Sequence, residues 1–223
     1  FSSFNVNWAL SSLPAGSFDT SSITSVNGPF FSHFNSAWAL TSLPAGSFDI
    51  SNITGSVGSS FFLFFNRDWK LTSLPDWSFD TSNITSVGVY FFTAFNGGWK
   101  ITSLPVGSFN ISNITSVGDY FFQDFNYNWT LTSLPTGSFN TSNIRNIGKN
   151  FFSSFNYTWA LTSLPAGSFN ISNITGGVGT GFFYNFNRNW ALTSLPTGSF
   201  NTSNITNVWA YFFYHFNSAW TLT

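Results

Sequence analysis

The sequence lacks cysteine, methionine and glutamate, and only 6% of its 223 residues are charged. The absence of cysteine excludes disulfides and thiolate metal sites, and it leaves the redox compartment open. The net charge of −1 offers no basic surface for phosphate groups, so nucleic acid is not an expected partner. No run of about 18 apolar residues is present, so this segment contains no predicted membrane span.

Groups for catalysis or metal binding are also scarce. His33 and His215 are the only histidines and lie in units at opposite ends of the chain, so we expect them to form neither a metal pair nor a catalytic triad. A line of calcium-binding carboxylates at Asp19, Asp49 and Asp80 is disfavoured, because asparagine takes the same place in every later unit. The sequence therefore predicts no enzymatic activity, no metal and no cofactor.

What the chain has in quantity is aromatic residues, and it repeats itself. It contains 31 phenylalanines and 10 tryptophans. One unit reads approximately W-x-L-T-S-L-P-x-G-S-F-[DN]-[TI]-S-N-I-T-S-V-G-x-x-F-F-x-x-F-N-x-x. Threonine and isoleucine alternate strictly after the Asp/Asn position, which indicates a duplicated two-unit block and suggests alternating surfaces. A period of 30 or 31 residues is marked in each copy by a tryptophan: Trp8, Trp38, Trp69, Trp99, Trp129, Trp159, Trp190 and Trp220.

Each unit divides into two predicted elements. Val87, Phe91, Phe92 and Phe95 have the spacing of one apolar helix face, and Ser86 before them is a good N-cap residue. The Leu-Thr-Ser-Leu-Pro segment is compatible with a short strand that pairs in parallel with its neighbours. Because so short a unit cannot bury its phenylalanines alone, we expect the units to stack.

The sequence thus predicts a leucine-rich-repeat-like solenoid over residues 1–223, a single uncapped domain. It would contain about seven units of 30–31 residues, each with one short parallel strand and one short helix. Both ends of the sequence fall within a unit, so we expect a segment of a longer repeat array.

The phrase after the predicted strand resembles a known family. Residues 79–85 read FDTSNIT, and Leu71, Leu74 and Phe79 fit the strand pattern before it. The chain therefore resembles bacterial leucine-rich-repeat surface proteins, in which a short strand is followed by F-D-T-S-N-V-T and a small helix. This resemblance implies a right-handed solenoid that is secreted or displayed on a cell surface, often with a role in adhesion.

Asparagine recurs in several columns, and one of them is interpreted as structural. The asparagine of Phe-Asn occurs in every copy, although only Asn156 among them spells an N-glycosylation acceptor. Recurrence without the acceptor motif indicates an internal ladder that satisfies backbone groups. Its members are Asn5, Asn35, Asn66, Asn96, Asn126, Asn156, Asn187 and Asn217.

The candidates for N-glycosylation fall into two rows and one isolated site. A first row follows Gly-Ser-Phe, exchanges with aspartate in early units, and is expected to point outward: Asn110, Asn140, Asn170 and Asn201. A second row lies three residues later and is equally compatible with capping and with glycosylation: Asn52, Asn83, Asn113, Asn173 and Asn204. Asn143 belongs to the second row but is no acceptor, because Arg145 replaces the threonine. Asn128 stands alone in a variable column and is expected to be exposed.

Aromatic residues outside the phenylalanine pattern are candidates for a recognition surface. The repeating tryptophan column is either a stacked core ladder or an exposed row that stacks on sugar rings. Trp77 and Trp209 replace glycine in their columns and are expected to be exposed. All tyrosines lie in variable columns and join them as a possible binding surface: Tyr90, Tyr120, Tyr127, Tyr157, Tyr184, Tyr211 and Tyr214.

These features predict a non-enzymatic extracellular or cell-surface repeat protein. Covalent N-glycans would solubilise a nearly uncharged, phenylalanine-rich rod, and copies of the chain would assemble into a fibre or a surface coat. The alternative is an adhesin module that binds a host protein or glycan through the exposed tyrosine and tryptophan columns.

Overall fold

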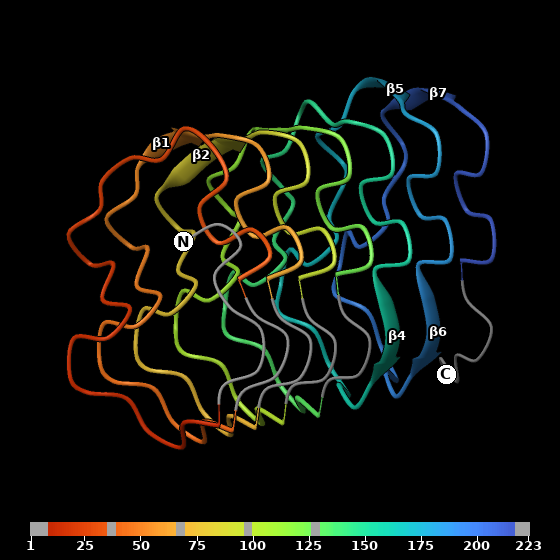
Figure 1. Cartoon of the computed structure of the whole chain (residues 1–223). Helices are drawn as coiled ribbons and strands as arrows, with labels where there is room; N and C mark the ends of the chain where they lie inside the picture. Colours follow the sequence, from red (N-terminus) through yellow and green to blue (C-terminus); the bar gives the residue numbers. More distant parts are fainter. Residues whose placement is uncertain (1–8, 35–38, 66–69, 96–99, 126–129, 217–223) are drawn as a thin grey trace.

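Successive repeat units form coils that lie side by side along the chain (Figure 1). The structure is a computed structural model that describes residues 9–34, 39–65, 70–95, 100–125 and 130–216, with the backbone alone at 156–159 and 187–190. Neighbouring coils are joined by hydrogen bonds between residues 29 to 32 positions apart. The chain is therefore a repeat protein whose sequence period is also a period in space.

Short parallel strands connect some of these coils. The described strands are β1 (Gly55–Val57), β2 (Ile84–Val87), β3 (Ser116–Val117), β4 (Asn156–Trp159), β5 (Gly176–Val178), β6 (Asn187–Trp190) and β7 (Ile205–Val208). One sheet has the order β1-β2-β3, and two further sheets pair β4 with β6 and β5 with β7. The Ile-Thr-Ser-Val sequence of β2 favours a strand because three of its residues are β-branched. Ile84 and Val87 are buried there, whereas Thr85 is exposed.

Four columns of phenylalanine rings form the core. Equivalent rings of neighbouring coils lie 5.1–6.0 Å apart between centroids, and nearly all of them are stacked. Rings of different columns meet edge to face, as Phe79 and Phe95 do at 5.3 Å and 89°. Offset stacks combined with edge contacts are the arrangements that aromatic rings prefer. The columns are Phe18, Phe48, Phe79, Phe109, Phe139, Phe169 and Phe200; Phe30, Phe61, Phe91, Phe121, Phe151, Phe182 and Phe212; Phe31, Phe62, Phe92, Phe122, Phe152, Phe183 and Phe213; and Phe34, Phe65, Phe95, Phe125, Phe155, Phe186 and Phe216.

A buried serine ladder runs in register with the rings. Ser108 Oγ donates to the carbonyl of Ser78 at 2.8 Å, and Ser138 Oγ donates to the carbonyl of Ser108 at 2.9 Å. All three serines are fully buried. Each hydroxyl is thus satisfied by the preceding coil, so a polar column is accommodated beside an apolar core.

The alternation of threonine and isoleucine lies inside the stack. Thr81 and Ile111 are both fully buried. The Thr81 hydroxyl donates to the carbonyl of Asn110 in the next coil at 2.7 Å, whereas isoleucine fills the equivalent space with apolar atoms. The suggestion that successive units present alternating surfaces through this column is therefore wrong.

The predicted helix is also wrong, because no described residue lies in a helix. After β2 the chain continues through turns whose N–H groups donate to the next coil. Tyr90 N donates to the carbonyl of Asp119 at 3.0 Å, and Phe92 N donates to that of Phe121 at 2.9 Å. Hydrogen bonds between coils replace the bonds that a helix would make within itself. With no helix in this part of the chain, none there could cross a membrane.

Backbone geometry explains why a helix cannot form at this position. Tyr90 and Ala94 adopt left-handed φ values of 59° and 49°, which right-handed helices do not contain. Gly88 lies so close to the preceding coil that a Cβ added to it would lie 2.7 Å from the backbone nitrogen of Ser59. The helix-like spacing of the phenylalanines is thus produced by a sequence of turns that directs several side chains inward.

The strand predicted at Leu-Thr-Ser-Leu-Pro is likewise displaced. The described residues of this segment form no strand, although Leu71 is fully buried as expected. Ser78 N donates to the Pro75 carbonyl at 3.3 Å and closes a turn. Proline cannot donate to a strand ladder, which explains the irregular backbone there. The parallel strands lie instead in the Ile-Thr-Ser-Val segment and in β4 and β6.

The ring columns generate a prediction about stability. Phe122 is fully buried, and its ring stacks on Phe92 and on Phe152 at 5.5 Å each. Phe122→Ala should lower the free energy of unfolding by about 3–5 kcal/mol, because it opens a cavity between two coils. The denaturant midpoint measures this loss. Val106→Ala is the control, since Val106 is 77% exposed; equal midpoints for the two variants would contradict the stacked core.

Candidate functional site

The turn after each Gly-Ser-Phe segment carries both rows of candidate acceptor asparagines. In the first row, the side-chain oxygen accepts a hydrogen bond from the backbone N–H two residues later. Asp80 Oδ1 accepts from Ser82 N at 2.8 Å, and Asn170 Oδ1 accepts from Ser172 N at 3.0 Å. Aspartate and asparagine provide the same oxygen, which explains why they exchange in this column. The same bond occurs at Asp19, Asp49, Asn110, Asn140 and Asn201.

The first row is largely enclosed between coils. Asn110, Asn140 and Asn170 are half-buried, and only Asn201 is exposed. A Cβ added to Gly137 of the next coil would lie 2.8–3.0 Å from Oδ1, Cγ and Nδ2 of Asn110, so the amide that would carry a sugar lies against the next coil. The expectation that this row points outward is therefore wrong at Asn110, Asn140 and Asn170, whereas Asn201 is exposed in the last described coil, where no further described coil covers it.

The second row is exposed to solvent. Asn113 Nδ2 donates to the Ser82 carbonyl of the preceding coil at 2.6 Å, and Asn173 Nδ2 donates to that of Ser142 at 2.5 Å. An amide nitrogen has two hydrogens, and a glycosylated asparagine keeps one of them. The ladder bond and a sugar are thus chemically compatible. The same bond occurs at Asn52, Asn83, Asn143 and Asn204.

A turn between the two rows explains their different exposure. Ile174 N donates to the carbonyl of Ile171 at 3.1 Å, and both isoleucines are buried. The turn brings Ser172 and Asn173 to the outside of the coil. Strict alternation along an extended strand would instead have placed Asn173 inside, so the exposure of this row could not be read from the sequence.

Several candidate residues lie outside the described part of the chain. Nothing in the structure bears on the side chains of the repeating tryptophan column, on the internal asparagine ladder, on Asn128 or on two of the tyrosines. The residues concerned are Trp8, Trp38, Trp69, Trp99, Trp129, Trp159, Trp190 and Trp220; Asn5, Asn35, Asn66, Asn96, Asn126, Asn156, Asn187 and Asn217; and Asn128, Tyr127 and Tyr157.

The two irregular tryptophans are exposed, as the sequence predicts. Trp77 is 52% exposed and Trp209 is 64% exposed. Trp77 also adopts a left-handed φ of 65°, in a column where glycine has φ values of 78–87°. A large side chain in this conformation is costly, because its Cβ approaches the backbone. Trp77 therefore occupies a position that glycine would occupy at lower energy.

The tyrosines that the structure describes form two clusters, both on segments that flank the Phe-Phe dipeptides. Tyr90 and Tyr120 stack at 4.8 Å, and Lys149 Nζ lies 5.3 Å from the Tyr120 ring. Lys149 also lies 3.7 Å from the carboxylate of Asp119. The hydrogen bond with Tyr120, reinforced by the charge of Asp119, raises the pKa of Lys149. The second cluster contains Tyr184, Tyr211 and Tyr214.

The second tyrosine cluster lines a surface pocket. Its other lining residues are Asn150, Ser153, Thr180 and Gly181, none of which the sequence analysis singled out. The available signal was Gly181 itself, which interrupts a column that holds tyrosine in three other coils. No group of three or more histidine, aspartate or glutamate side chains in the described ranges could hold a metal ion.

Comparison of the chain with protein-family models, with curated proteins and with solved structures finds no match in any of the three. The features of the molecule that bear on function are the exposed asparagine row, the exposed tryptophans and the tyrosine clusters.

The conformation of Trp77 leads to a second prediction. Trp77→Gly should raise the free energy of unfolding by about 1 kcal/mol, because glycine adopts the left-handed conformation without steric cost. Thermal or denaturant unfolding measures the change. Trp209→Gly is the matched control, since Trp209 is an exposed tryptophan without a positive φ. A loss of stability in Trp77→Gly equal to that in the control would contradict the strain.

A third prediction concerns pH. Partial desolvation by neighbouring protein atoms raises the pKa of Asp124 although the residue as a whole is exposed, and hydrogen bonds from Ser154 and Gln123 offset only part of the effect. The folded protein then binds this proton more tightly than the unfolded chain does, so stability should fall as pH rises from about 4 through the raised pKa. Asp124→Asn should remove this decline, and asparagine also suits the left-handed φ of 50°. Denaturant midpoints across that pH range test it; an unchanged slope would contradict the assignment.

Proposed function

We propose that the chain is a non-enzymatic, N-glycosylated repeat protein of the extracellular space or cell surface, which builds a fibre or a coat. The exposed second asparagine row carries this proposal. Five of its members are followed by Ile-Thr, and they repeat at equivalent positions on the outer turns: Asn52, Asn83, Asn113, Asn173 and Asn204. Sugars there would form a line along the stack. The hydrated sugars would help to solvate the rod, because its own surface carries few charged side chains.

The proposal includes the finer fold assignment, a leucine-rich-repeat-like solenoid. The FDTSNIT phrase at residues 79–85 and the winding of the units into adjacent coils support it (Figure 1). The lack of a helix in the described residues departs from that resemblance. The assembly into fibres or coats is supported by the repeated contacts between successive coils, each of which offers its neighbour equivalent rings and hydrogen-bonding groups.

The alternative function is an adhesin that binds a host protein or glycan. The exposed Trp77 favours it, because strained backbone is retained where another requirement outweighs its cost. Tyr211 and Tyr214 are also exposed, at 57% and 46%, in the last coil that the structure describes. Loss of glycan-array binding in Trp77→Ala and Trp209→Ala would favour the adhesin over the coat.

The glycan coat is tested by intact mass. The 223-residue chain, secreted from a eukaryotic host, should exceed its bare mass of 24.7 kDa and return to that mass after enzymatic release of N-glycans. Glycopeptide mapping should find the second row more fully occupied than Asn110, Asn140 and Asn170, whose amides face neighbouring coils. A mass equal to that of the bare polypeptide would contradict the proposal.

The chain also offers a matched test of accessibility. Asn143 occupies the second row but lacks an acceptor motif because Arg145 follows at the second position. In a secreting eukaryotic host, Arg145→Thr should add one glycan at Asn143. Arg145→Lys creates no acceptor and should add none. Failure of Arg145→Thr to gain a glycan, while Asn113 and Asn173 also stay bare, would show that this row is closed to the transferase.

A further inference from the structure

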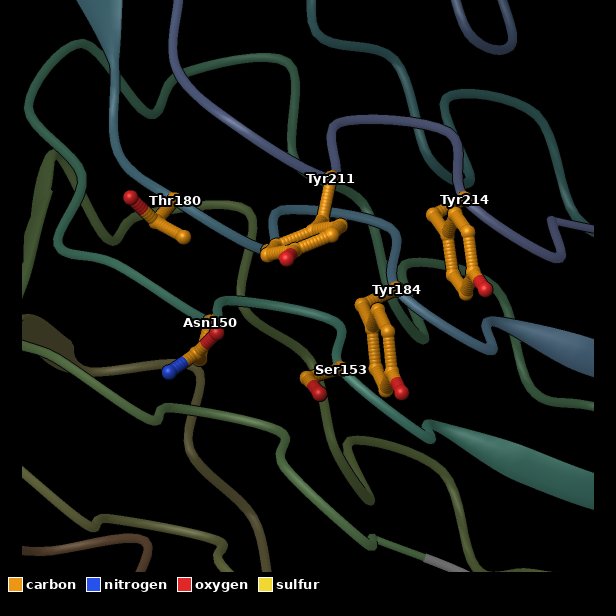
Figure 2. Close-up of a pocket in the computed structure, with 7 residues that line it drawn as sticks. Asn150, Ser153, Thr180, Tyr184, Tyr211 and Tyr214 are labelled. Atoms are coloured by element: carbon orange, nitrogen blue, oxygen red, sulfur yellow. The ribbon is translucent and has the colours of Figure 1, made fainter.

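The pocket between the coils of Asn150, Gly181 and Tyr211 has the character of a ligand site. It has a volume of about 430 Å³ and is lined by Asn150, Ser153, Thr180, Gly181, Tyr184, Tyr211 and Tyr214. In Figure 2 the ring of Tyr211 lies across the centre of the pocket, with Tyr184 and Tyr214 side by side next to it. Asn150 and Thr180 lie on the opposite side of Tyr211, so aromatic and polar groups surround one space.

The pocket lies where one variable column holds two smaller residues, Asn150 and Gly181, in successive coils. Gly181 stands in the position that Tyr90, Tyr120 and Tyr211 occupy in other coils. Its φ of 71° is left-handed, and a Cβ added to it would overlap Asn150 Oδ1. The recess is therefore fixed by the backbone and by the neighbouring amide, and an ordinary side chain could not fill it without displacing Asn150.

The aromatic walls are held in place by one another. Tyr184 and Tyr214 stack at 5.4 Å with an interplanar angle of 4°. Tyr211 meets Tyr184 edge to face at 5.9 Å and Tyr214 at 5.5 Å. Mutual packing of this kind reduces the freedom that the rings would lose when a ligand binds, which favours affinity.

The polar groups of the pocket are numerous and uncharged. They are the Asn150 amide, the hydroxyls of Ser153 and Thr180, and the three phenol hydroxyls; the lining contains no aspartate, glutamate, lysine, arginine or histidine. Such a lining suits a neutral ligand that combines a hydroxyl-bearing rim with a flat face of C–H groups. A pyranose ring has both features. The volume lies within the range of about 300–1,000 Å³ for small-molecule sites.

We propose that this pocket binds a neutral pyranose unit of an oligosaccharide, with the sugar face against Tyr211 and its hydroxyls on Asn150, Ser153 and Thr180. This inference does not depend on the glycan coat proposed above. It gives the alternative adhesin function a defined site, distinct from Trp77. An anionic sugar is disfavoured, because no cation lines the pocket to pair with it.

The experiment uses the 223-residue chain produced in bacteria, so that it carries no N-glycans of its own. Isothermal titration calorimetry against cellotriose, mannotriose and chitotriose should detect binding of at least one neutral trisaccharide. Sialyllactose, an anionic trisaccharide, should bind more weakly than that sugar. Tyr211→Ala should weaken the binding about tenfold, because it removes an aromatic wall. Asn150→Gly should weaken it as well, since glycine keeps the left-handed backbone while removing the amide.

Tyr90→Ala is the matched control. Tyr90 occupies the same column as Tyr211 with a similar φ, 59° against 64°, but its ring stacks on Tyr120 and lines no part of the pocket. Binding should be unchanged in this variant. Absence of heat with all three neutral trisaccharides would overturn the proposal. So would equal weakening in Tyr90→Ala and Tyr211→Ala, which would indicate a general loss of folding. Mass spectrometry of the chain secreted from a eukaryotic host decides the glycan coat separately.

Discussion

Stacking between equivalent phenylalanine rings of successive coils is the interaction on which the rest of this structure depends. The rings repeat at 5.1–6.0 Å, which is close to the spacing of about 4.8 Å between hydrogen-bonded strands. Rings and backbone bonds can therefore advance together, one coil at a time. The other columns then repeat with the same spacing between coils, including the buried serine ladder and the asparagine rows on the outer turns. Little regular secondary structure is needed, because contacts between coils replace contacts within an element.

Because the coils are stacked in this way, surface positions differ in whether a neighbouring coil covers their side chains. A side chain that points along the stack contacts the next coil and is half-buried. Asn170 is such a residue, and its side-chain oxygen also caps its own turn. A side chain three residues later, such as Asn173, leaves the stack and keeps its amide in solvent. A glycine in a variable column, as at Gly181, leaves a recess between coils without disturbing the ring columns. Functional variation is thus confined to columns outside the phenylalanine core.

The period, the phenylalanine core and the exposure of Trp77 and Trp209 could be predicted from the sequence, because repetition and burial depend on residue type and spacing. The secondary structure could not. The spacing of Val87, Phe91 and Phe92 fits a helix face equally well as a series of turns, and only contacts between coils distinguish them. The recurrent glycine after the valine, Gly88 in this unit, was the available signal against a helix. The exposure of Asn173 depends on a turn at Ser172, which the side-chain hydrogen bond of Asn170 favours but which the alternation of an extended strand would not predict.

The register between coils is tested most directly by engineered disulfides in this cysteine-free chain. Ser56 and Ser86 are parallel partners in β1 and β2, and their Oγ atoms lie 2.5 Å apart. Ser56→Cys with Ser86→Cys should therefore form a disulfide readily under mild oxidation. Ser56→Cys with Ser116→Cys should not, because two coil spacings of about 4.8 Å exceed the Cα separation that a disulfide spans. Free thiols in the first pair, or a disulfide in the second, would contradict the stacked register.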